Sequence, residues 1–403
     1  MHESDIPAAV TLARSHHEAG RLAQAELIYR QILELAPQHA DALHLLGAAL
    51  HQSGQNEPAV EYFSRAIALH PDRAIYYNSL GSAYCALQQY TDAINSYQHS
   101  LALKGDYAEA QFNLGVVYSD LDNIDMALQC YRNAIALKPG FAAAYYNCGI
   151  VLKKHRRFDE ALEYFREVVR HQPHNETALH FIAALSSTAS ERAPAQYIAG
   201  IFDGSAETFE QHLVQALGYD TPQRLVELIG RCAGPPAANW NVLDLGCGTG
   251  LVGAAIAPYA SSLVGVDLSG RMLDQARTRR LYQRLEQQEL LQQMQQEESA
   301  SYDLIIAADV LIYFGRLDAV FREARRLLKM GGLFACSVEA LDSEAQEEGP
   351  AYRLDHTGRY AHSSVYLKKL AAEYGFLSGQ MVYVRTRLEA GEPVQAWLAL
   401  WQC

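Results

Sequence analysis

Three features are absent from this sequence of 403 residues: a long apolar run, paired cysteines and an excess of basic residues. No apolar stretch approaches the roughly 18 residues that cross a bilayer, and the first residues lack the basic-then-apolar pattern of a secretory signal. The seven cysteines are dispersed without a CxxC pair, which argues against a disulfide framework or a zinc site. We therefore expect a cytoplasmic protein with no membrane partner and no metal.

Basic residues are too few for a general nucleic-acid binder. The chain has 33 Lys and Arg against 46 Asp and Glu, which gives a net charge of -13. Because binding of a phosphate backbone needs clustered Lys and Arg, we expect no nucleic-acid partner. The length and the 49% hydrophobic content allow two or three domains, each with its own core.

The first half of the sequence repeats with a period of 34 residues. Four columns keep this spacing: Pro37, Pro71, Gly105, Pro139 and Pro173; Gly47, Gly81, Gly115 and Gly149; Ala25, Ala59, Ala93, Ala127 and Ala161; and Tyr29, Phe63, Tyr97, Tyr131 and Phe165. The pattern predicts two helices per repeat, because glycine and alanine let helix backbones approach closely. The aromatic residue is expected to fill the space between repeats, and proline to end the second helix.

These columns resemble the tetratricopeptide repeat, and five repeats cover residues 6–175. Residues 176–195 are expected to form a capping helix and a linker, because stacked repeats need a cap on their last face. The resemblance implies an all-α solenoid that docks a protein or peptide partner on its concave face. The candidate positions on that face are His44, Asn78, Phe112 and Tyr146.

The second half of the sequence alternates strand and helix patterns, which indicates a parallel sheet covered by helices. Two amphipathic helices are expected first, at 208–219 and 222–232. Strands are then expected at 241–245, 261–268, 302–314 and 332–339, and helices at 249–260, 270–285 and 317–330. The last elements are a helix at 362–376 and a hairpin of strands at 380–388 and 393–402. The sheet therefore ends in an antiparallel pair.

A glycine turn follows the first expected strand, with Gly246, Gly248 and Gly250 spaced GxGxG. This spacing differs from the GxGxxG of dinucleotide folds, and no Lys-Ser/Thr follows to make a phosphate-binding loop. Asp244 precedes the turn, where it would repel a pyrophosphate but suits a sulfonium and an ammonium. Asp267 ends the next strand, where it can accept both ribose hydroxyls. The residues favour a cationic cofactor, with a nicotinamide-dependent oxidoreductase as the alternative.

The stretches VLDLGCGTG, VGVDLS, YDLIIAADVLIYF and LLKMGGLFACSVE resemble those of class I S-adenosylmethionine-dependent methyltransferases over residues 196–403. This resemblance implies a Rossmann-like domain with a mostly parallel seven-stranded sheet, an antiparallel C-terminal hairpin and S-adenosyl-L-methionine as cofactor. The whole arrangement is similar to bacterial predicted methyltransferases with tetratricopeptide repeats, which share segments like 202–222 and 356–367. The resemblance does not name the methyl acceptor.

The resemblance also implies a set of cofactor-binding residues. They are Asp244, Gly246, Cys247, Gly248, Gly250, Asp267, Leu268, Met272, Glu289 and Leu290. Asp244 is expected to support the turn and the ammonium, Asp267 to bind ribose, and Leu268 and Met272 to enclose the adenine. Glu289 either faces the adenine amine or lies on a solvated helix. Cys247 is interpreted as a small filler, because nothing near it in the sequence would lower its pKa.

Candidates for catalysis follow the fourth and fifth expected strands. They are Asp309, Tyr313 and His362 for catalysis, and Arg359 and Tyr360 for substrate binding. His362 can act as a base at neutral pH, or it can cap the following helix. Arg359 suits an anionic group of the substrate, or a surface salt bridge.

The sequence thus predicts a methyltransferase that transfers a methyl group to an unidentified acceptor and docks a protein or peptide partner on its repeats. A repeat scaffold with an inactive methyltransferase-like domain is the alternative from another functional class.

Overall fold

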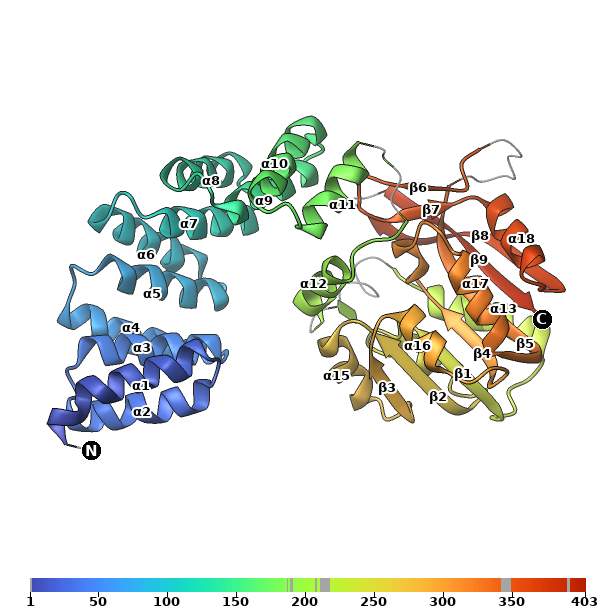
Figure 1. The fold of residues 1–403 in the computed structure, drawn as a ribbon, viewed down its shortest axis with the longest axis horizontal. Coiled ribbons are helices and arrows are strands. Elements are labelled where there is room, and N and C mark those ends of the chain that lie inside the picture. The colour runs from blue at the N-terminus through green and yellow to red at the C-terminus, as the bar shows by residue number, and fades with distance from the viewer. Residues whose placement is uncertain are drawn as a thin grey trace. The chain divides into compact units, whose positions relative to one another are not determined.

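The computed structural model describes residues 2–186, 188, 191–206, 209–210, 218–341, 349–389 and 392–403. The chain divides into two compact units, Met1–Pro173 and His174–Cys403. The first unit is helical throughout and the second contains the sheet (Figure 1). Within the described ranges, no helix is both long and apolar enough to cross a membrane.

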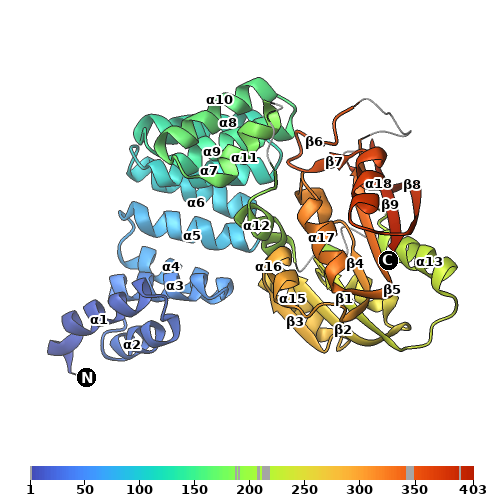
Figure 2. The same cartoon turned by 45° about the vertical axis from the view of Figure 1, so that its right-hand side comes forward.

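The first unit consists of antiparallel helix pairs that stack side by side (Figures 1 and 2). A short 3-10 helix, η1 (Glu3–Asp5), precedes them. The helices are α1 (Ile6–Glu18), α2 (Leu22–Leu35), α3 (Ala40–Gln52), α4 (Asn56–Leu69), α5 (Ala74–Ala86), α6 (Tyr90–Leu103), α7 (Ala108–Asp120), α8 (Ile124–Leu137), α9 (Ala142–Lys154) and α10 (Phe158–His171). They form five pairs with the predicted period, so the repeat pattern is confirmed in the first unit.

In the repeats that carry the column glycine, the aromatic ring packs against that glycine. A Cβ on Gly47 of α3 would lie 2.8 Å from the ring of Phe63 on α4, and a Cβ on Gly81 would lie 2.7 Å from the ring of Tyr97. Only glycine leaves room for these rings, which are buried. In the four repeats that carry this glycine, the ring therefore covers the glycine of its own helix pair, and the core cluster of Phe63 also includes Leu80 and Ala83 of the next repeat.

Side chains at the expected concave positions link neighbouring repeats. The Nε2 atom of His44 lies 2.9 Å from Ser79 Oγ, and the amide of Asn113 donates to Asn78 Oδ1 at 3.1 Å. The His44 ring also stacks on Tyr76, with 4.7 Å between the ring centroids. These polar atoms therefore hold the first helices of adjacent repeats together.

The second unit is built on one sheet with helices on both of its faces (Figures 1 and 2). The strands are β1 (Trp240–Leu245), β2 (Ala260–Asp267), β3 (Arg284–Gln287), β4 (Tyr302–Ala307), β5 (Leu328–Ala340), β6 (Tyr352–Leu354), β7 (Tyr360–His362), β8 (Ser378–Glu389) and β9 (Glu392–Gln402). The helices are α11 (Glu176–Leu185), α12 (Ala195–Ser205), α13 (Thr221–Ala233), α14 (Leu251–Ile256), α15 (Gly270–Thr278), α16 (Leu290–Gln296), η3 (Leu311–Tyr313), α17 (Asp318–Leu327) and α18 (Ser364–Glu373).

The strand order confirms the predicted methyltransferase-like sheet. Strands β3, β2, β1, β4 and β5 are adjacent and parallel, β9 is antiparallel to β5, and β8 is antiparallel to β9. The short strands β7 and β6 extend the end of β5 and were not predicted. From β1 the chain adds β2 and β3 on one side of the sheet, and then crosses to add β4 and β5 on the other side. The strand order therefore reverses beside β1, and ligands bind in such sheets at the carboxyl ends of the strands at this point.

Several predicted elements end earlier than expected, and two of them end by far the earliest. The helix predicted for 270–285 stops at Thr278, because Arg280 adopts a φ of 57° and the chain turns into β3. The strand predicted for 302–314 stops at Ala307, because Asp309 adopts a φ of 52° and η3 follows. Most of the helix predicted for 208–219 lies outside the described residues.

The segment between the repeats and the sheet belongs to the second unit. His180 of α11 lies 2.9 Å from the carbonyl oxygen of Gly358, and the Tyr197 hydroxyl of α12 donates to the carbonyl oxygen of Thr357. Between these helices, the Ala193 N–H donates to Tyr313 O at 2.8 Å and the Gly315 N–H donates to Glu191 O at 2.7 Å. We call residues 191–193 the strap, because they bond to the chain that follows β4.

Candidate active site

The glycine turn lies where the sequence predicted, at the carboxyl end of β1. Gly246 has a φ of 68°, and a Cβ at this position would lie 2.6 Å from the side chain of Val310. Both observations require glycine, since other residues rarely adopt this backbone conformation. The turn therefore brings its backbone close to the loop after β4 and leaves an open space above β1 and β2.

Asp267 at the end of β2 fixes the glycine turn. Its Oδ2 accepts from the Gly248 N–H at 2.9 Å, and its Oδ1 accepts from the Ser269 N–H at 2.8 Å. Burial raises the pKa of this carboxyl group, and the backbone donors of Ser269 and Gly248 oppose the rise. A carboxylate has about four acceptor positions, so Asp267 keeps acceptor capacity toward the cavity that it lines.

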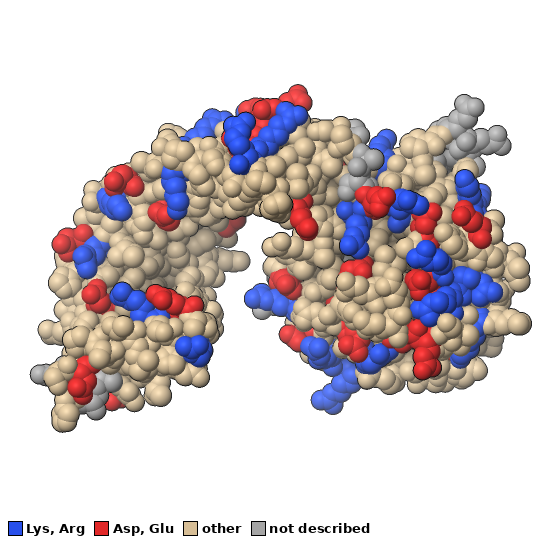
Figure 3. Space-filling view, in the orientation of Figure 1, with Lys and Arg blue, Asp and Glu red and all other residues tan. Residues whose placement is uncertain are grey.

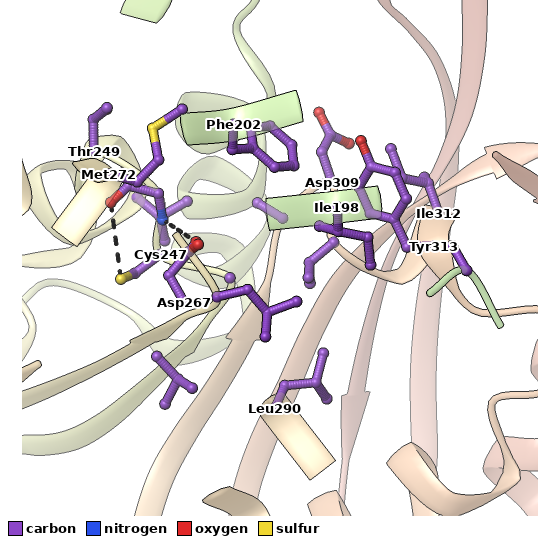
Figure 4. Close-up of a pocket in the computed structure, with 18 of the residues that line it drawn as sticks. Ile198, Phe202, Cys247, Thr249, Asp267, Met272, Leu290, Asp309, Ile312 and Tyr313 are labelled. Atoms are coloured by element: carbon purple, nitrogen blue, oxygen red, sulfur yellow. Dashed lines mark hydrogen bonds between the residues drawn. The ribbon is translucent and has the colours of Figure 1, made fainter. Parts of the chain in front are cut away.

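A cavity of about 240 Å³ opens beside the turn and Asp267. Figure 4 shows Cys247, Thr249, Asp267 and Met272 at one end and Asp309, Ile312 and Tyr313 at the other. Eight residues predicted for the cofactor line it: Gly246, Cys247, Gly248, Asp267, Leu268, Met272, Glu289 and Leu290. The geometry thus brings together the turn after β1, the end of β2, α15 and the start of α16, which are far apart in sequence.

Two other predicted cofactor residues, Asp244 and Gly250, do not line the cavity. Asp244 is fully buried below the turn, where its Oδ2 accepts from the Tyr282 hydroxyl at 2.7 Å. Burial raises the pKa of Asp244 to about 7, and Asp267 adds to the rise. Gly250 has a φ of 88° and precedes α14. Both residues shape the turn from outside the cavity.

Glu289 lies in the cavity wall and not on a solvated helix face. It precedes α16, and its Oε2 accepts from the Gln292 N–H at 3.1 Å. The side chain is only 16% exposed and lines the cavity. Its Oε1 is buried, has no hydrogen-bond partner among the residues that the structure describes, and lies 3.9 Å from the Arg192 guanidinium. A buried acceptor atom of this kind needs a donor.

Cys247 is a buried filler of the turn. Its Sγ would lie 2.9 Å from a Cβ on Gly265 of the neighbouring strand. Burial raises the thiol pKa well above its usual range, and the carboxylates of Asp244 and Asp267 raise it further. A thiol held in its neutral form is a poor nucleophile.

The other end of the cavity is lined by Asp309, Tyr313 and Arg359, which were predicted, and by Arg387, which was not. The Arg359 Nε donates to Glu339 at 2.7 Å and its Nη2 donates to Glu389. Arg387 donates to the same Glu339 oxygen at 2.6 Å. Arg359 is therefore held in an ion network, which favours the salt-bridge alternative over a free anion-binding group. Arg359 and Glu339 are mostly buried, whereas Glu389 is 41% exposed.

His362 and Tyr360 do not lie in the cavity wall. His362 is fully buried, its Nε2 lies 3.1 Å from Gly315 O, and burial lowers its pKa to about 4. A neutral imidazole that donates to a carbonyl orients the loop after η3 and cannot reach an acceptor in the cavity. Tyr360 is also fully buried, with its ring 6.0 Å from that of Tyr352. Neither of these side chains is placed for its predicted role.

Several cavity residues were missed by the sequence prediction. Ile198 and Phe202 of α12 and Tyr219 before α13 line the cavity together with Asp309 and Tyr313; we call this part of the cavity the acceptor end. The spacing of four residues between Ile198 and Phe202 is a helical signal, but nothing in it indicates a contact with the loop after β4. Among the described residues, no cluster of three His, Cys, Asp or Glu side chains could hold a metal ion.

Comparisons with known proteins agree with this division of the chain. The family model described as "Methyltransferase domain" matches residues 243–334. Models of the tetratricopeptide repeat match residues 6–83, 108–141 and 142–175, and a model described as "TPR repeat" matches 81–122.

Two curated relatives are methyltransferases by name. Methyltransferase-like protein 27 from Homo sapiens is 29% identical over 164 residues, which are 40% of this chain and 66% of the relative. Ubiquinone biosynthesis O-methyltransferase from Pseudomonas aeruginosa (strain LESB58) is 31% identical over 98 residues, which are 24% of this chain and 42% of that relative. The chain spans less than two thirds of the length of both relatives.

Among solved structures, MamA is 28% identical and has a TM-score of 0.37, with 40% of this chain and 94% of that chain covered. The repeat models match in the first unit and the methyltransferase model matches in the second. The chain is thus a tetratricopeptide-repeat protein that carries a methyltransferase domain.

Proposed function

We propose that the second unit transfers a methyl group from S-adenosyl-L-methionine. The main support for this function is the cavity between the glycine turn, Asp267 and Glu289. The chemistry of the lining residues suits this cofactor. Asp267 keeps acceptor positions for the ribose hydroxyls, and Glu289 keeps a buried oxygen for the adenine amine. Leu268, Met272 and Leu290 supply apolar surface for the adenine ring.

The charge around this end of the cavity favours a sulfonium cofactor over a dinucleotide. Asp267 and Glu289 line the wall and Asp244 lies buried below it. Opposite charges attract strongly where water is excluded, so three carboxylates support a cofactor with a sulfonium and an ammonium. A pyrophosphate would meet repulsion from the same groups.

Calorimetric titration of the full chain with S-adenosylmethionine, S-adenosylhomocysteine and NADH tests this proposal. We expect both sulfur compounds to bind and NADH not to bind. Asp267→Ala should weaken S-adenosylhomocysteine binding by about 100-fold, because two hydrogen bonds to a charged acceptor are lost. The matched control is Asp274→Ala, which removes an exposed carboxylate from α15. Binding of NADH alone would assign the cavity to a nicotinamide cofactor.

Turnover separates an active enzyme from a repeat scaffold with an inactive domain. Labelled S-adenosylmethionine is incubated with the full chain and a cell lysate, and the label is followed into protein and small-molecule fractions. An active domain predicts transfer that is lost in the Asp267→Ala variant. Cofactor binding without any transfer would favour the scaffold. In either case we propose that the first unit docks a protein or peptide partner, which its repeat architecture supports.

A further inference from the structure

We propose that the methyl acceptor is an amine, which enters the cavity as an ammonium and is held by the Asp309 carboxylate among aromatic rings. This inference rests on the proposed function, because it concerns the acceptor end of the same cavity. Four observations support this inference: the charge balance of the ion network, the position of Asp309, the three aromatic rings near it and the neutral state of the two phenols.

The ion network at the acceptor end has an excess of one negative charge. Arg359 and Arg387 form ion pairs with Glu339, Glu389 and Asp309, and within the described residues these five groups pair only with one another. Two guanidinium groups therefore face three carboxylates. An added anion would increase the imbalance, whereas an added cation would neutralise it.

The excess charge lies on Asp309, which faces the cavity. Glu339 is held by both arginines at 2.7 Å and 2.6 Å, whereas the closest guanidinium atom to Asp309 Oδ2 is 3.9 Å away on Arg387. Asp309 has a φ of 52°, a conformation that costs free energy in a residue other than glycine. The Ser337 hydroxyl compensates by accepting from the Asp309 N–H at 2.7 Å and donating to its Oδ1 at 2.6 Å.

Aromatic rings surround this carboxylate. Phe202 of α12 and Tyr313 of η3 lie edge to face with 6.0 Å between their centroids, and both line the cavity beside Asp309 (Figure 4). Tyr219 also lines the cavity, and the Asp309 carboxylate is among the groups that raise the pKa of its phenol, after burial. Ring faces next to a carboxylate are a recurrent way to bind ammonium groups.

The two phenols remain neutral at physiological pH. Burial raises the pKa of Tyr313 to about 12 and raises that of Tyr219 well above its usual range. Neither phenol therefore accepts the proton that an attacking nucleophile must lose. Asp309 is the group in contact with the acceptor that can take it.

The transfer balances as an N-methylation. S-adenosylmethionine supplies an electrophilic methyl group on a sulfonium. The ammonium gives one proton to Asp309, and the nitrogen lone pair then forms a bond to the methyl carbon as the carbon–sulfur bond breaks and its electron pair stays on sulfur. The product is a methylated ammonium, and the proton passes from Asp309 to water.

The test measures the affinities of three matched probes for the full chain: 2-phenylethylamine, 2-phenylethanol and 3-phenylpropionate. Calorimetry at pH 7.5 is run with and without S-adenosylhomocysteine, whose own binding is measured first. We expect the amine to bind at least about 10-fold more tightly than the other two, because a charged hydrogen bond replaces a neutral or repulsive contact. The amine, the alcohol and the acid differ only in the terminal group.

Two substitutions sharpen the test. Asp309→Asn should reduce the preference for the amine to about threefold or less, while Asp274→Asn on the surface of α15 should preserve it. Phe202→Leu should weaken binding of the amine by about 2-fold to 30-fold, which is the range of cation–π contacts, and should weaken binding of the alcohol by less. Binding of S-adenosylhomocysteine to each variant reports that the cavity is folded.

The outcomes separate this inference from the proposed function. An amine that binds no better than the alcohol or the acid, including no detectable binding of all three, overturns the inference even if S-adenosylhomocysteine binds. A preference for 3-phenylpropionate would assign the arginine pair to an anionic acceptor. A preference for the amine together with failure of S-adenosylhomocysteine to bind would leave the amine site and reject the methyl-transfer function.

Discussion

The buried carboxyl group of Asp244 should make the stability of the second unit fall as pH rises. Its pKa is about 7 in the folded chain, because burial penalises the charged form, and about 3.8 when exposed. The folded state therefore holds a proton that the unfolded state releases between these two values. The contribution of Asp244 to stability is largest below pH 4, decreases from pH 4 to pH 7, and is constant above.

The magnitude follows from the size of the shift. Three pKa units correspond to roughly 4 kcal/mol, lost at about 1.4 kcal/mol for each pH unit. Asp244→Asn removes the ionisation but leaves an oxygen for the Tyr282 hydroxyl. Relative to the unaltered chain, the variant should therefore gain roughly 4 kcal/mol between pH 4 and pH 8. For a unit of this size the gain corresponds to roughly 10 °C in the melting temperature.

Scanning calorimetry of both proteins from pH 4 to pH 8 measures this difference. Asp274→Asn is the control, since it removes an equal charge from a side chain that is 70% exposed. Tyr282→Phe should increase the pH dependence of the original chain, because it removes the hydroxyl that favours the charged form. A stability difference between Asp244→Asn and the original chain that does not change with pH would refute the reasoning.

Three further predictions concern packing and charge. Gly246→Ala should destabilise the second unit by at least about 2 kcal/mol, because its φ is 68° and the new Cβ would meet Val310; Gly140→Ala, with open space around it, should change the melting temperature little. Phe63→Ala should cost the first unit about 3–5 kcal/mol, measured by chemical denaturation, whereas Leu27→Ala at an exposed position should cost far less. Arg387→Ala should destabilise the second unit by about 3–5 kcal/mol, since it leaves Glu339 and Asp309 with fewer partners. Thermal melting of this variant is compared with that of Arg322→Ala, which removes an exposed arginine. Equal losses of stability in the two variants would contradict the prediction.

The repeats, the sheet order and the cofactor end of the cavity could be predicted from the sequence because their signals are local. A period of 34 residues and a glycine turn followed by Asp267 are short-range patterns. The early end of α15 could not be predicted, because the chain turns where Tyr282 reaches Asp244, a contact across 38 residues. The acceptor end depends on still longer contacts. Arg387 meets Glu339 across 48 residues, and no motif marks either of them.

His362 illustrates why a residue type alone does not fix a role. Its place after an expected strand and before a helix allowed a base or a cap. In the fold, Ser363 caps α18 through the Tyr366 N–H, and the imidazole turns inward to the carbonyl of Gly315. Burial then lowers the pKa of the imidazole to about 4, so that it binds a proton only weakly at neutral pH.

The strap limits where the chain can be divided into separate domains. Glu191 and Ala193 bond to Gly315 and Tyr313, immediately beside the proposed acceptor site, although they precede the predicted start of the catalytic domain at residue 196. A protein cut at 196 would lose these bonds together with α11. Exchange of the repeats for those of another protein, in evolution or in the laboratory, should therefore preserve activity only when the junction lies before residue 174. The linker would then be inherited with the methyltransferase domain and not with the repeats.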